Sequence, residues 1–407
     1  MCLARDLIVG TGASFRCAAG VLALIAKRFA LASATPCFST IRSWIIRLGC
    51  YSLRCPLPQH TSWVWMVDHT IQIGPQKLLA VVGCVLTDVP FGKRSLTLGD
   101  LRLIALVPMT HSTHEHVAAE LEKATARTGV PRLIVSDHGT DVKKGVEDFQ
   151  KRHPITAHVH DIAHYGANVL ENRWERDPRW QEFLRQLQQV NQKMRQTADA
   201  YLVAPTLRPK GRFMSVGPLL RFAKRVLQLL EREKPHEKVV ARYGWLGDYR
   251  QPLEGWLEEH RLTQTTIEWV RRHGINSETL EKLERTWGKL SERPSTGMVA
   301  GYMRVYVRKY GRQAQPSETL VGSTEALESS FGKLKRLEGD KVSGGFTGLV
   351  LALGALTGNA SEATVREALD AVPQKEADGW IKRNLGATLR WLRKSVFGKE
   401  QTVTELG

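Results

Sequence analysis

The order of strand and helix signals between residues 62 and 165 constrains the fold of this chain more than any other feature. Three apolar runs come first without a helix signal between them, which predicts three consecutive antiparallel strands. Helix, strand, helix and strand signals follow, and a capping-box pattern at 112–115 marks the first helix. The five predicted strands are 63–67, 78–86, 101–107, 133–136 and 155–159. This order predicts an α/β domain with one mixed five-stranded sheet and flanking helices.

Two aspartates follow the first and the fourth of these apolar runs. They are Asp68 and Asp137. The strand and helix order is that of the ribonuclease H-like fold, in which strands one and four are neighbours. Ligands of open α/β sheets bind beyond the carboxyl ends of the strands, although an aspartate at a strand end is also a common turn cap. The order therefore predicts that the two carboxylates meet, and a doubly wound fold of another kind is the competing topology.

A third carboxylate lies on a predicted helix within the segment 323–335. Leu327, Phe331 and Leu334 recur at i, i+4 and i+7 and predict the side of the helix that packs. Glu328 and Lys335 are two turns apart, so their side chains line up beside that stripe. The alternative is an ordinary amphipathic helix with a solvated charged face.

Neighbouring residues compete for these roles. Glu325 is three residues from Glu328, but its position in the first turn favours a helix-start role, where the helix dipole stabilises a carboxylate. Asp141 is close to Asp137, but no strand directly precedes it. His138 is typical of a loop histidine. We therefore favour Glu328 and Asp137 as ligands.

Three carboxylates from distant parts of the sequence match the needs of a two-magnesium site. Mg²⁺ prefers oxygen ligands and leaves room for water and substrate phosphate. Two such ions stabilise the attacking and leaving oxygens of an in-line phosphoryl transfer. Asp68 would bridge both ions, and Asp137 and Glu328 would each bind one. No G-x-S-x-G or G-x-x-x-x-G-K-[ST] motif occurs, which argues against a serine nucleophile and against NTP hydrolysis.

Taken together, these elements resemble the DDE transposases of bacterial insertion sequences, a ribonuclease H-like superfamily related to retroviral integrases. The family's third carboxylate stands in a Glu-Ser pair that is followed by Leu-Lys, and 328–329 and 334–335 match it. The family also has an Asp and a His after the second aspartate, matched by Asp161 and His164. The resemblance covers about residues 60–340.

The resemblance implies a transposase that uses Mg²⁺, or Mn²⁺ in its place, to cleave 3′ ends and to transfer strands. It implies double-stranded DNA as the partner, a homo-oligomer on that DNA, and a cytoplasmic, nucleoid-associated protein. Asp161 and His164 would support the metal ligands, or form a purely structural pair. Lys333 and Lys335 would contact DNA. The alternatives are a ribonuclease H-like nuclease without strand transfer and a non-catalytic DNA-binding remnant.

The net charge and the N-terminal helices also favour DNA as the partner. The chain has 58 Lys and Arg against 41 Asp and Glu, a net charge of +17, which favours a polyanion. Predicted helices at 14–29 and 39–49 resemble a helix-turn-helix, in which Arg42 and Arg47 would face DNA. A helical cap packed on the next domain is the alternative. This segment is short for a reader of transposon ends, which predicts that the chain begins partway through that domain.

The spacing of the carboxylates predicts an inserted domain. Asp137 and Glu328 are 191 positions apart, a gap that resembles the transposase subgroup with a helical insertion. The predicted parts are a helix-turn-helix-like segment (1–60), the first part of the catalytic core (61–165), a helical insertion with core tryptophans (166–315), the glutamate helix (316–345) and a basic helical tail (346–407). The tail's basic residues are Lys382, Arg383, Arg390, Arg393 and Lys394.

The remaining signals concern the cysteines and membranes. All six cysteines lie at or before Cys84 and form no CxxC pair. They are predicted to be buried free thiols in a reducing compartment. The apolar runs are too short for a transmembrane span, so no membrane partner is expected.

Overall fold

The computed structural model describes the chain except for residues 32–33, 74–75, 208–210, 339–346, 386–394 and 398–407. Three basic residues of the predicted tail, Arg390, Arg393 and Lys394, lie outside the described part. The chain forms two compact units, one of Met1–Val159 with Thr324–Gly407 and the other of His160–Ser323. Among the described residues, no helix combines the length and the apolar character that a membrane span requires.

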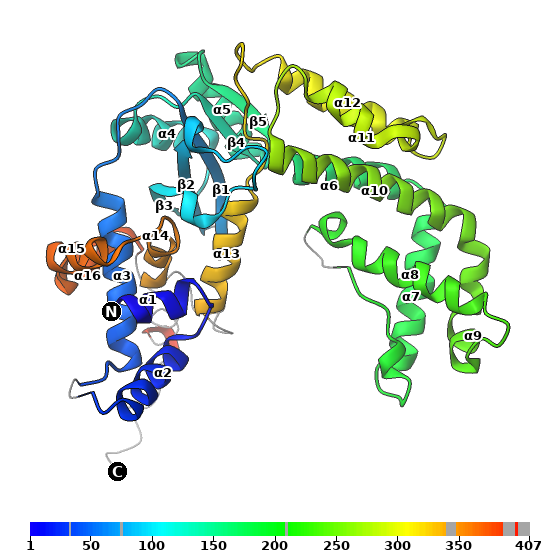
Figure 1. Cartoon of the computed structure of the whole chain (residues 1–407), viewed down its shortest axis with the longest axis horizontal. Helices are drawn as coiled ribbons and strands as arrows, with labels where there is room; N and C mark the ends of the chain where they lie inside the picture. Colours follow the sequence, from blue (N-terminus) through cyan, green and yellow to red (C-terminus); the bar gives the residue numbers. More distant parts are fainter. Residues whose placement is uncertain (32–33, 74–75, 208–210, 339–346, 386–394, 398–407) are drawn as a thin grey trace. The chain divides into compact units, whose positions relative to one another are not determined.

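The first unit is built on a five-stranded sheet with the order β3-β2-β1-β4-β5 (Figure 1). The β1–β2 and β2–β3 pairs are antiparallel, and β1 pairs with β4 in parallel. This arrangement is ribonuclease H-like, so the predicted fold class is confirmed. The strands are β1 (Trp63–Ile73), β2 (Gln76–Val85), β3 (Arg102–Met109), β4 (Leu133–Ser136) and β5 (Ala157–His160).

Strand β1 is longer than the sequence predicted. Its antiparallel pairing with β2 continues as far as Ile73 and Gln76, whereas its parallel pairing with β4 ends at Val67 and Ser136. Asp68 therefore lies inside β1 and not at its end. It is the first β1 residue beyond the pairing with β4, so it still lies at the carboxyl edge of that strand pair.

Alternate residues of β1 face opposite sides of the sheet. Trp65 and Val67 are fully buried in a core that also contains residues of α4 (His114–Thr128) and α5 (Thr140–Arg152). Asp68 has the opposite parity in the strand. Its side chain therefore lies on the face turned away from α4 and α5.

That second face is covered by α3 (Phe38–Arg54), α13 (Glu325–Glu338) and α14 (Ala352–Leu356) (Figure 1). Helix α14 packs closely on β3, since a Cβ on Gly354 would lie 3.0 Å from the side chain of Leu103. The next residue of β3, Ile104, faces the α4/α5 core, so Leu103 and α14 lie on the other face of the sheet. Both α3 and α13 contact α14, and α13 also contacts β1.

The described residues of the N-terminal segment, 1–31 and 34–60, contain three helices, where the sequence predicted two. The additional helix, α1 (Cys2–Val9), is short and has no side-chain cap, so no sequence signal marked its start. Helix α2 (Phe15–Arg28) begins after Ser14, whose side chain accepts a hydrogen bond from the backbone N–H of Cys17. Helix α3 contacts α14, α15 (Glu362–Ala371) and α16 (Gln374–Asn384). This packing favours the helical-cap alternative for α3 over a free DNA-reading helix.

The prediction that the cysteines are buried is wrong for two of them. Cys17 and Cys37 are exposed, whereas Cys50 and Cys84 are buried. Cys37 precedes α3, and hydrogen bonds with the Ser39 and Thr40 hydroxyls lower the pKa of its thiol to about 6. The amphipathic pattern of the N-terminal helices did not indicate which cysteines would face solvent.

The second unit consists of helices and their connections, as far as its residues are described, and it takes in the predicted insertion 166–315. Buried aromatic rings form its centre, with the ring centroids of Trp174 and Trp180 4.8 Å apart and those of Trp180 and Trp256 also 4.8 Å apart. Trp287 is buried too, while Trp245 and Trp269 are half-buried. The main helices are α6 (Ile162–Trp174), α7 (Pro178–Met194), α8 (Gly217–Leu230), α9 (Glu237–Tyr243), α10 (Arg250–His273), α11 (Thr279–Trp287) and α12 (Gly297–Gly311).

Candidate active site

The register of two parallel strands brings Asp68 and Asp137 to neighbouring positions. Val67 of β1 pairs with Ser136 of β4, and each aspartate is the next residue along its chain. Neighbouring strands lie about 4.8 Å apart, so the two half-buried carboxylates stand at adjacent strand positions. Asp68 Oδ1 accepts a hydrogen bond from the backbone N–H of His69 at 2.6 Å.

The turn after Asp137 has an unusual backbone. Asp137 Oδ1 accepts a hydrogen bond from the N–H of Gly139 at 2.8 Å, and His138 between them has a φ of 61°. This left-handed conformation is uncommon for a residue with a side chain. The His138 ring lies 4.5 Å from the ring of His158 in β5. His138 thus occupies a tight turn, as expected of a loop histidine, and this turn sets the direction of the Asp137 carboxylate.

Helix α13 carries the third candidate carboxylate, Glu328. Its predicted packing stripe is confirmed, because Leu327, Phe331 and Leu334 are all buried. Glu328 is half-buried, and its backbone N–H donates to the carbonyl of Thr324 at 3.1 Å in the first turn. Because α13 contacts β1, the helix with Glu328 packs against the strand with Asp68. This packing brings the helix that carries Glu328 to the sheet, although 191 positions separate Glu328 from Asp137 in the sequence.

Glu325 lies on another side of α13. It is exposed and lines a pocket of about 570 Å³ together with Gly99 and residues of α1, among them Arg5 and Val9. Lys333 lines the same pocket, and its Nζ donates to the carbonyl of Val9 at 2.9 Å. Glu325 therefore faces α1, which favours Glu328 as the third carboxylate.

The predicted DNA-binding lysines have different surroundings. Lys335 is exposed, whereas Lys333 is half-buried and holds α1 by the hydrogen bond to Val9. Of the two, Lys335 has the side chain that is more accessible to a phosphate backbone. The role of Lys333 in DNA binding stays a prediction, with an observed structural role beside it.

The predicted DNA-binding arginines of α3 are engaged within the first unit. The Arg47 guanidinium donates to the carbonyl of Val372 at 2.6 Å and also to that of Leu369. Burial lowers the pKa of Arg42, and the nearby charge of Asp378 partly offsets this. Both side chains are half-buried. These contacts attach α3 to the C-terminal helices, so the DNA contacts of Arg42 and Arg47 remain a prediction.

Asp161 and His164 form a helix cap in the second unit. Asp161 is fully buried and precedes α6, and its Oδ1 accepts the backbone N–H of His164 at 2.8 Å. An aspartate at this position satisfies an N–H group that the first helical turn leaves free. The structural alternative for this pair therefore describes an observed contact, and its support of metal ligands remains a prediction.

A polar network that joins residues of four segments was not predicted from the sequence. Asp141 Oδ2 accepts hydrogen bonds from Lys77 Nζ at 2.8 Å and from Ser112 Oγ at 2.6 Å. Ser112 Oγ is also 3.1 Å from His69 Nε2. The capping box had assigned Ser112 to the start of α4, but Thr113 is the cap, since its side chain accepts the N–H of His116. Ser112 is therefore available for the network.

The positive groups of the network both favour the ionised form of Asp141. Burial alone would raise the pKa of Asp141, but hydrogen bonds from Lys77 and Ser112 and the nearby charges of His69 and Lys77 hold it at about 2. Burial lowers the pKa of His69, and the charges of Asp141 and Asp137 act in the opposite direction. Asp141 is thus ionised and accepts hydrogen bonds from both Lys77 and Ser112.

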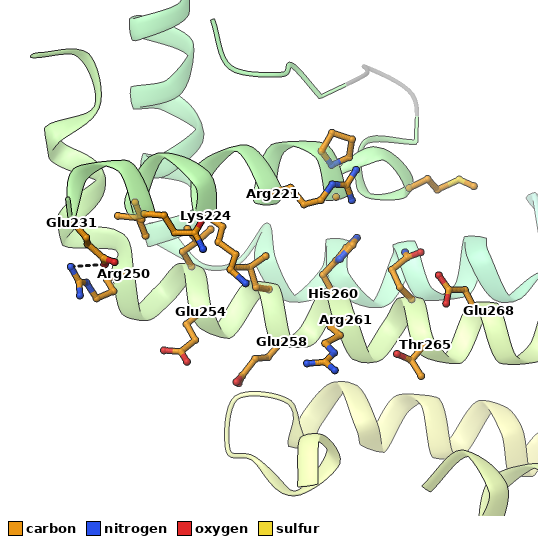
Figure 2. Close-up of a pocket in the computed structure, with 18 residues that line it drawn as sticks. Arg221, Lys224, Glu231, Arg250, Glu254, Glu258, His260, Arg261, Thr265 and Glu268 are labelled. Atoms are coloured by element: carbon orange, nitrogen blue, oxygen red, sulfur yellow. Dashed lines mark ion pairs between the residues drawn. The ribbon is translucent and has the colours of Figure 1, made fainter. Parts of the chain in front are cut away.

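A separate pocket of about 930 Å³ lies between α8 and α10 of the second unit (Figure 2). Basic and acidic side chains both line it, and Arg250 forms an ion pair with Glu231 at 2.9 Å. The mixed charge of its walls selects neither an anion nor a cation. The labelled lining residues also include Arg221, Lys224, Glu254, Glu258, His260 and Arg261.

His260 in this pocket should make stability depend on pH. Burial, helped by the charge of Arg221, lowers the pKa of His260 to about 4 from 6.5. Between pH 4 and 6.5 the unfolded chain therefore binds a proton at His260 more readily than the folded chain does. The contribution of neutral His260 to the free energy of unfolding is complete above pH 6.5 and is lost as the pH falls towards 4. The free energy of unfolding is measured by urea titration at a series of pH values. We expect its slope against pH to be smaller in His260→Gln than in the wild type, by up to about 1.4 kcal/mol per pH unit over this range. Equal slopes in both proteins would contradict the expectation.

No protein-family model matches this chain, and no curated protein matches it. Among solved structures, it is similar to the Drosophila P element transposase strand transfer complex, with 13% sequence identity and a TM-score of 0.38. The alignment covers 90% of this chain and 91% of that one. The order and the pairing of the strands define the ribonuclease H-like fold of this chain.

Proposed function

We propose that this chain is a DDE transposase that cleaves and joins DNA by metal-dependent phosphoryl transfer. The observation that carries the proposal is the register of Val67 and Ser136, which makes Asp68 and Asp137 neighbours at the carboxyl edge of two parallel strands. Helix α13 packs on the same strand and carries Glu328. The proposed catalytic residues are therefore Asp68, Asp137 and Glu328.

The donor set fits Mg²⁺ or Mn²⁺. All three side chains offer carboxylate oxygens, which hard divalent cations prefer. All three are half-buried, so water and a substrate phosphate can complete the coordination. When bound, the metal supplies the positive charge that stabilises the attacking and leaving oxygens. The residues themselves would hold the ions in place, and the turn at Asp137 would fix one carboxylate before DNA arrives.

Several features support DNA as the substrate. The net charge is +17, and Lys335 is exposed on the helix that carries Glu328, two turns further on. Lys335 would contact the DNA backbone as a point charge. The sequence resemblance extends the proposal to an insertion-sequence transposase that acts as a homo-oligomer on double-stranded DNA in the bacterial cytoplasm. In this proposal 166–315 is an insertion into the catalytic core and 346–407 is a basic tail.

The proposal predicts a metal-dependent joining reaction. We expect the full-length protein, given a duplex with the inverted repeats that flank its gene, to nick that DNA in Mg²⁺ or Mn²⁺ and to lose this activity in EDTA. We also expect a pre-cut 3′ end to be joined to a target duplex, measured as a longer labelled strand on a denaturing gel.

Other results would favour other functions. Nicking without any joined product would indicate a ribonuclease H-like nuclease. DNA binding without nicking in either metal would indicate a non-catalytic remnant.

A further inference from the structure

The network of Lys77, Ser112, His69 and Asp141 lies behind the carboxylates, on the opposite face of the sheet. His69 pairs with Leu79, and Leu79 belongs to the core beneath α4 and α5. Residues that pair directly across two strands share a face, so His69 faces α4 and α5. Asp68, one residue earlier, has the opposite parity and faces the α13 side.

The network joins the segments that surround the two aspartates. His69 follows Asp68 in β1, and Lys77 belongs to β2. Ser112 lies between β3 and α4, and Asp141 lies in the first turn of α5, directly after the turn that starts at Asp137. One carboxylate thus connects the strand of Asp68 to the loop of Asp137.

We propose that Asp141 is a positioning residue for the metal site, which through Lys77, Ser112 and His69 fixes the spacing of Asp68 and Asp137. The inference rests on the proposed function, because it needs these two carboxylates to bind metal. It assigns Asp141 a different role from that of a ligand. Its Oδ2 already accepts two hydrogen bonds, one from an ammonium group 2.8 Å away, and this partial neutralisation makes the carboxylate a poor metal donor.

The geometry of the turn explains why the link matters for chemistry. Asp137 is held by one backbone hydrogen bond and precedes a left-handed residue, His138. Only Gly139 and Thr140 separate His138 from Asp141 in the sequence. Releasing the Asp141 carboxylate would free the first turn of α5, and the Asp137 side chain would then sample positions away from Asp68. Loss of a group that orients metal ligands typically costs about 10–100-fold in metal affinity or activity.

The test compares two aspartates of α5 in the full-length protein. Asp141→Ala removes the link, whereas Asp148→Ala removes a carboxylate of the same helix that is bound to His114 and Lys151, at 2.8 and 2.6 Å. Mn²⁺ binding is measured without DNA by the electron paramagnetic resonance of the free ion. We expect Asp141→Ala to raise the Mn²⁺ dissociation constant about 10–100-fold and Asp148→Ala to leave it unchanged. Wild-type Mn²⁺ affinity in a folded Asp141→Ala protein would overturn the proposal.

Lys77→Met separates positioning from ligation. If Asp141 were itself a ligand, removing the lysine would free its carboxylate and tighten Mn²⁺ binding. A positioning role predicts the opposite, because the network loses a member and the affinity falls. Tighter binding in Lys77→Met would therefore contradict the proposal. This variant and Ser112→Ala also keep the test open if Asp141→Ala does not fold, as judged by circular dichroism.

Two further comparisons complete the design. Residues of one network are not additive, so Ser112→Ala in the Asp141→Ala protein should weaken Mn²⁺ binding by much less than it does in the wild type. Equal losses in the two backgrounds would contradict a shared network. Asp68→Asn serves as the reference for the metal site. If Asp68→Asn keeps wild-type Mn²⁺ affinity, the proposed function fails; if it loses affinity while Asp141→Ala does not, only the positioning role fails.

Discussion

Replacing any one of Asp68, Asp137 and Glu328 by its amide is expected to abolish DNA cleavage and joining while leaving DNA binding largely intact. An amide has nearly the same shape as the carboxylate but lacks its charge, so the packing of β1, β4 and α13 is kept while a metal ligand is lost. We expect each rate to fall by at least about 10³-fold, which corresponds to about 4 kcal/mol in the barrier. Cleavage is measured on labelled duplexes, and binding by gel mobility shift at fixed salt.

Glu325→Gln is the matched control for the Glu328→Gln variant. Both residues lie in the first turn of α13, but Glu325 faces the pocket beside α1. We therefore expect Glu325→Gln to cleave DNA like the wild type. If Glu325→Gln were inactive and Glu328→Gln active, the third ligand would be Glu325, and the orientation assigned to α13 would be wrong.

The sequence predicted those parts of the site that depend on local pattern. Continuous apolar runs indicated β1 and β4, and the chain order made these strands neighbours, which placed Asp68 beside Asp137. The spacing of Leu327, Phe331 and Leu334 gave the buried side of α13. The apolar runs and the helical spacing are local patterns that burial of apolar surface enforces, so one sequence is sufficient to detect them.

The parts that the sequence did not predict depend on contacts between distant segments. The sequence predicts Asp141 only as a rival ligand, because nothing in its own segment shows that Lys77 and Ser112 meet it across 64 and 29 positions. The end of β1 was placed too early because the hairpin with β2, and not the apolar run, determines where the strand stops.

Helix α3 shows the same limit for function. Its arginines and its position after a short break favoured a DNA-reading helix, and no local signal revealed that the helix is enclosed. In the structure it contacts β3 and α14 as well as α15 and α16, and Arg47 donates to two carbonyls of the C-terminal segment. Because α3 is packed on several sides, its contacts stabilise the first unit, and its role in DNA recognition stays a prediction.

The close packing of α3 on the C-terminal segment predicts a large effect of Gly49→Ala on stability. A Cβ on Gly49 would lie 1.7 Å from the carbonyl oxygen of Leu351, and a Cβ on Gly354 would lie 2.8 Å from the carbonyl oxygen of Gly49. Backbone atoms cannot move aside as a flexible side chain can, so α3 would have to separate from α14. We expect Gly49→Ala to lower the free energy of unfolding by about 3 kcal/mol or more, measured by urea titration of the full-length protein.

Gly20→Ala in α2 tests whether the effect comes from packing and not from the loss of a helical glycine. Gly20 is exposed, and nothing lies within 4 Å of the position of its Cβ. An alanine there should stabilise the helix by about 0.5–1 kcal/mol, because glycine loses more backbone entropy on folding. The two substitutions are chemically identical and should therefore act in opposite directions. If Gly49→Ala left the free energy of unfolding unchanged or raised it, α3 would not be packed between β3 and the C-terminal helices. That result would restore the case for α3 as a DNA-reading helix.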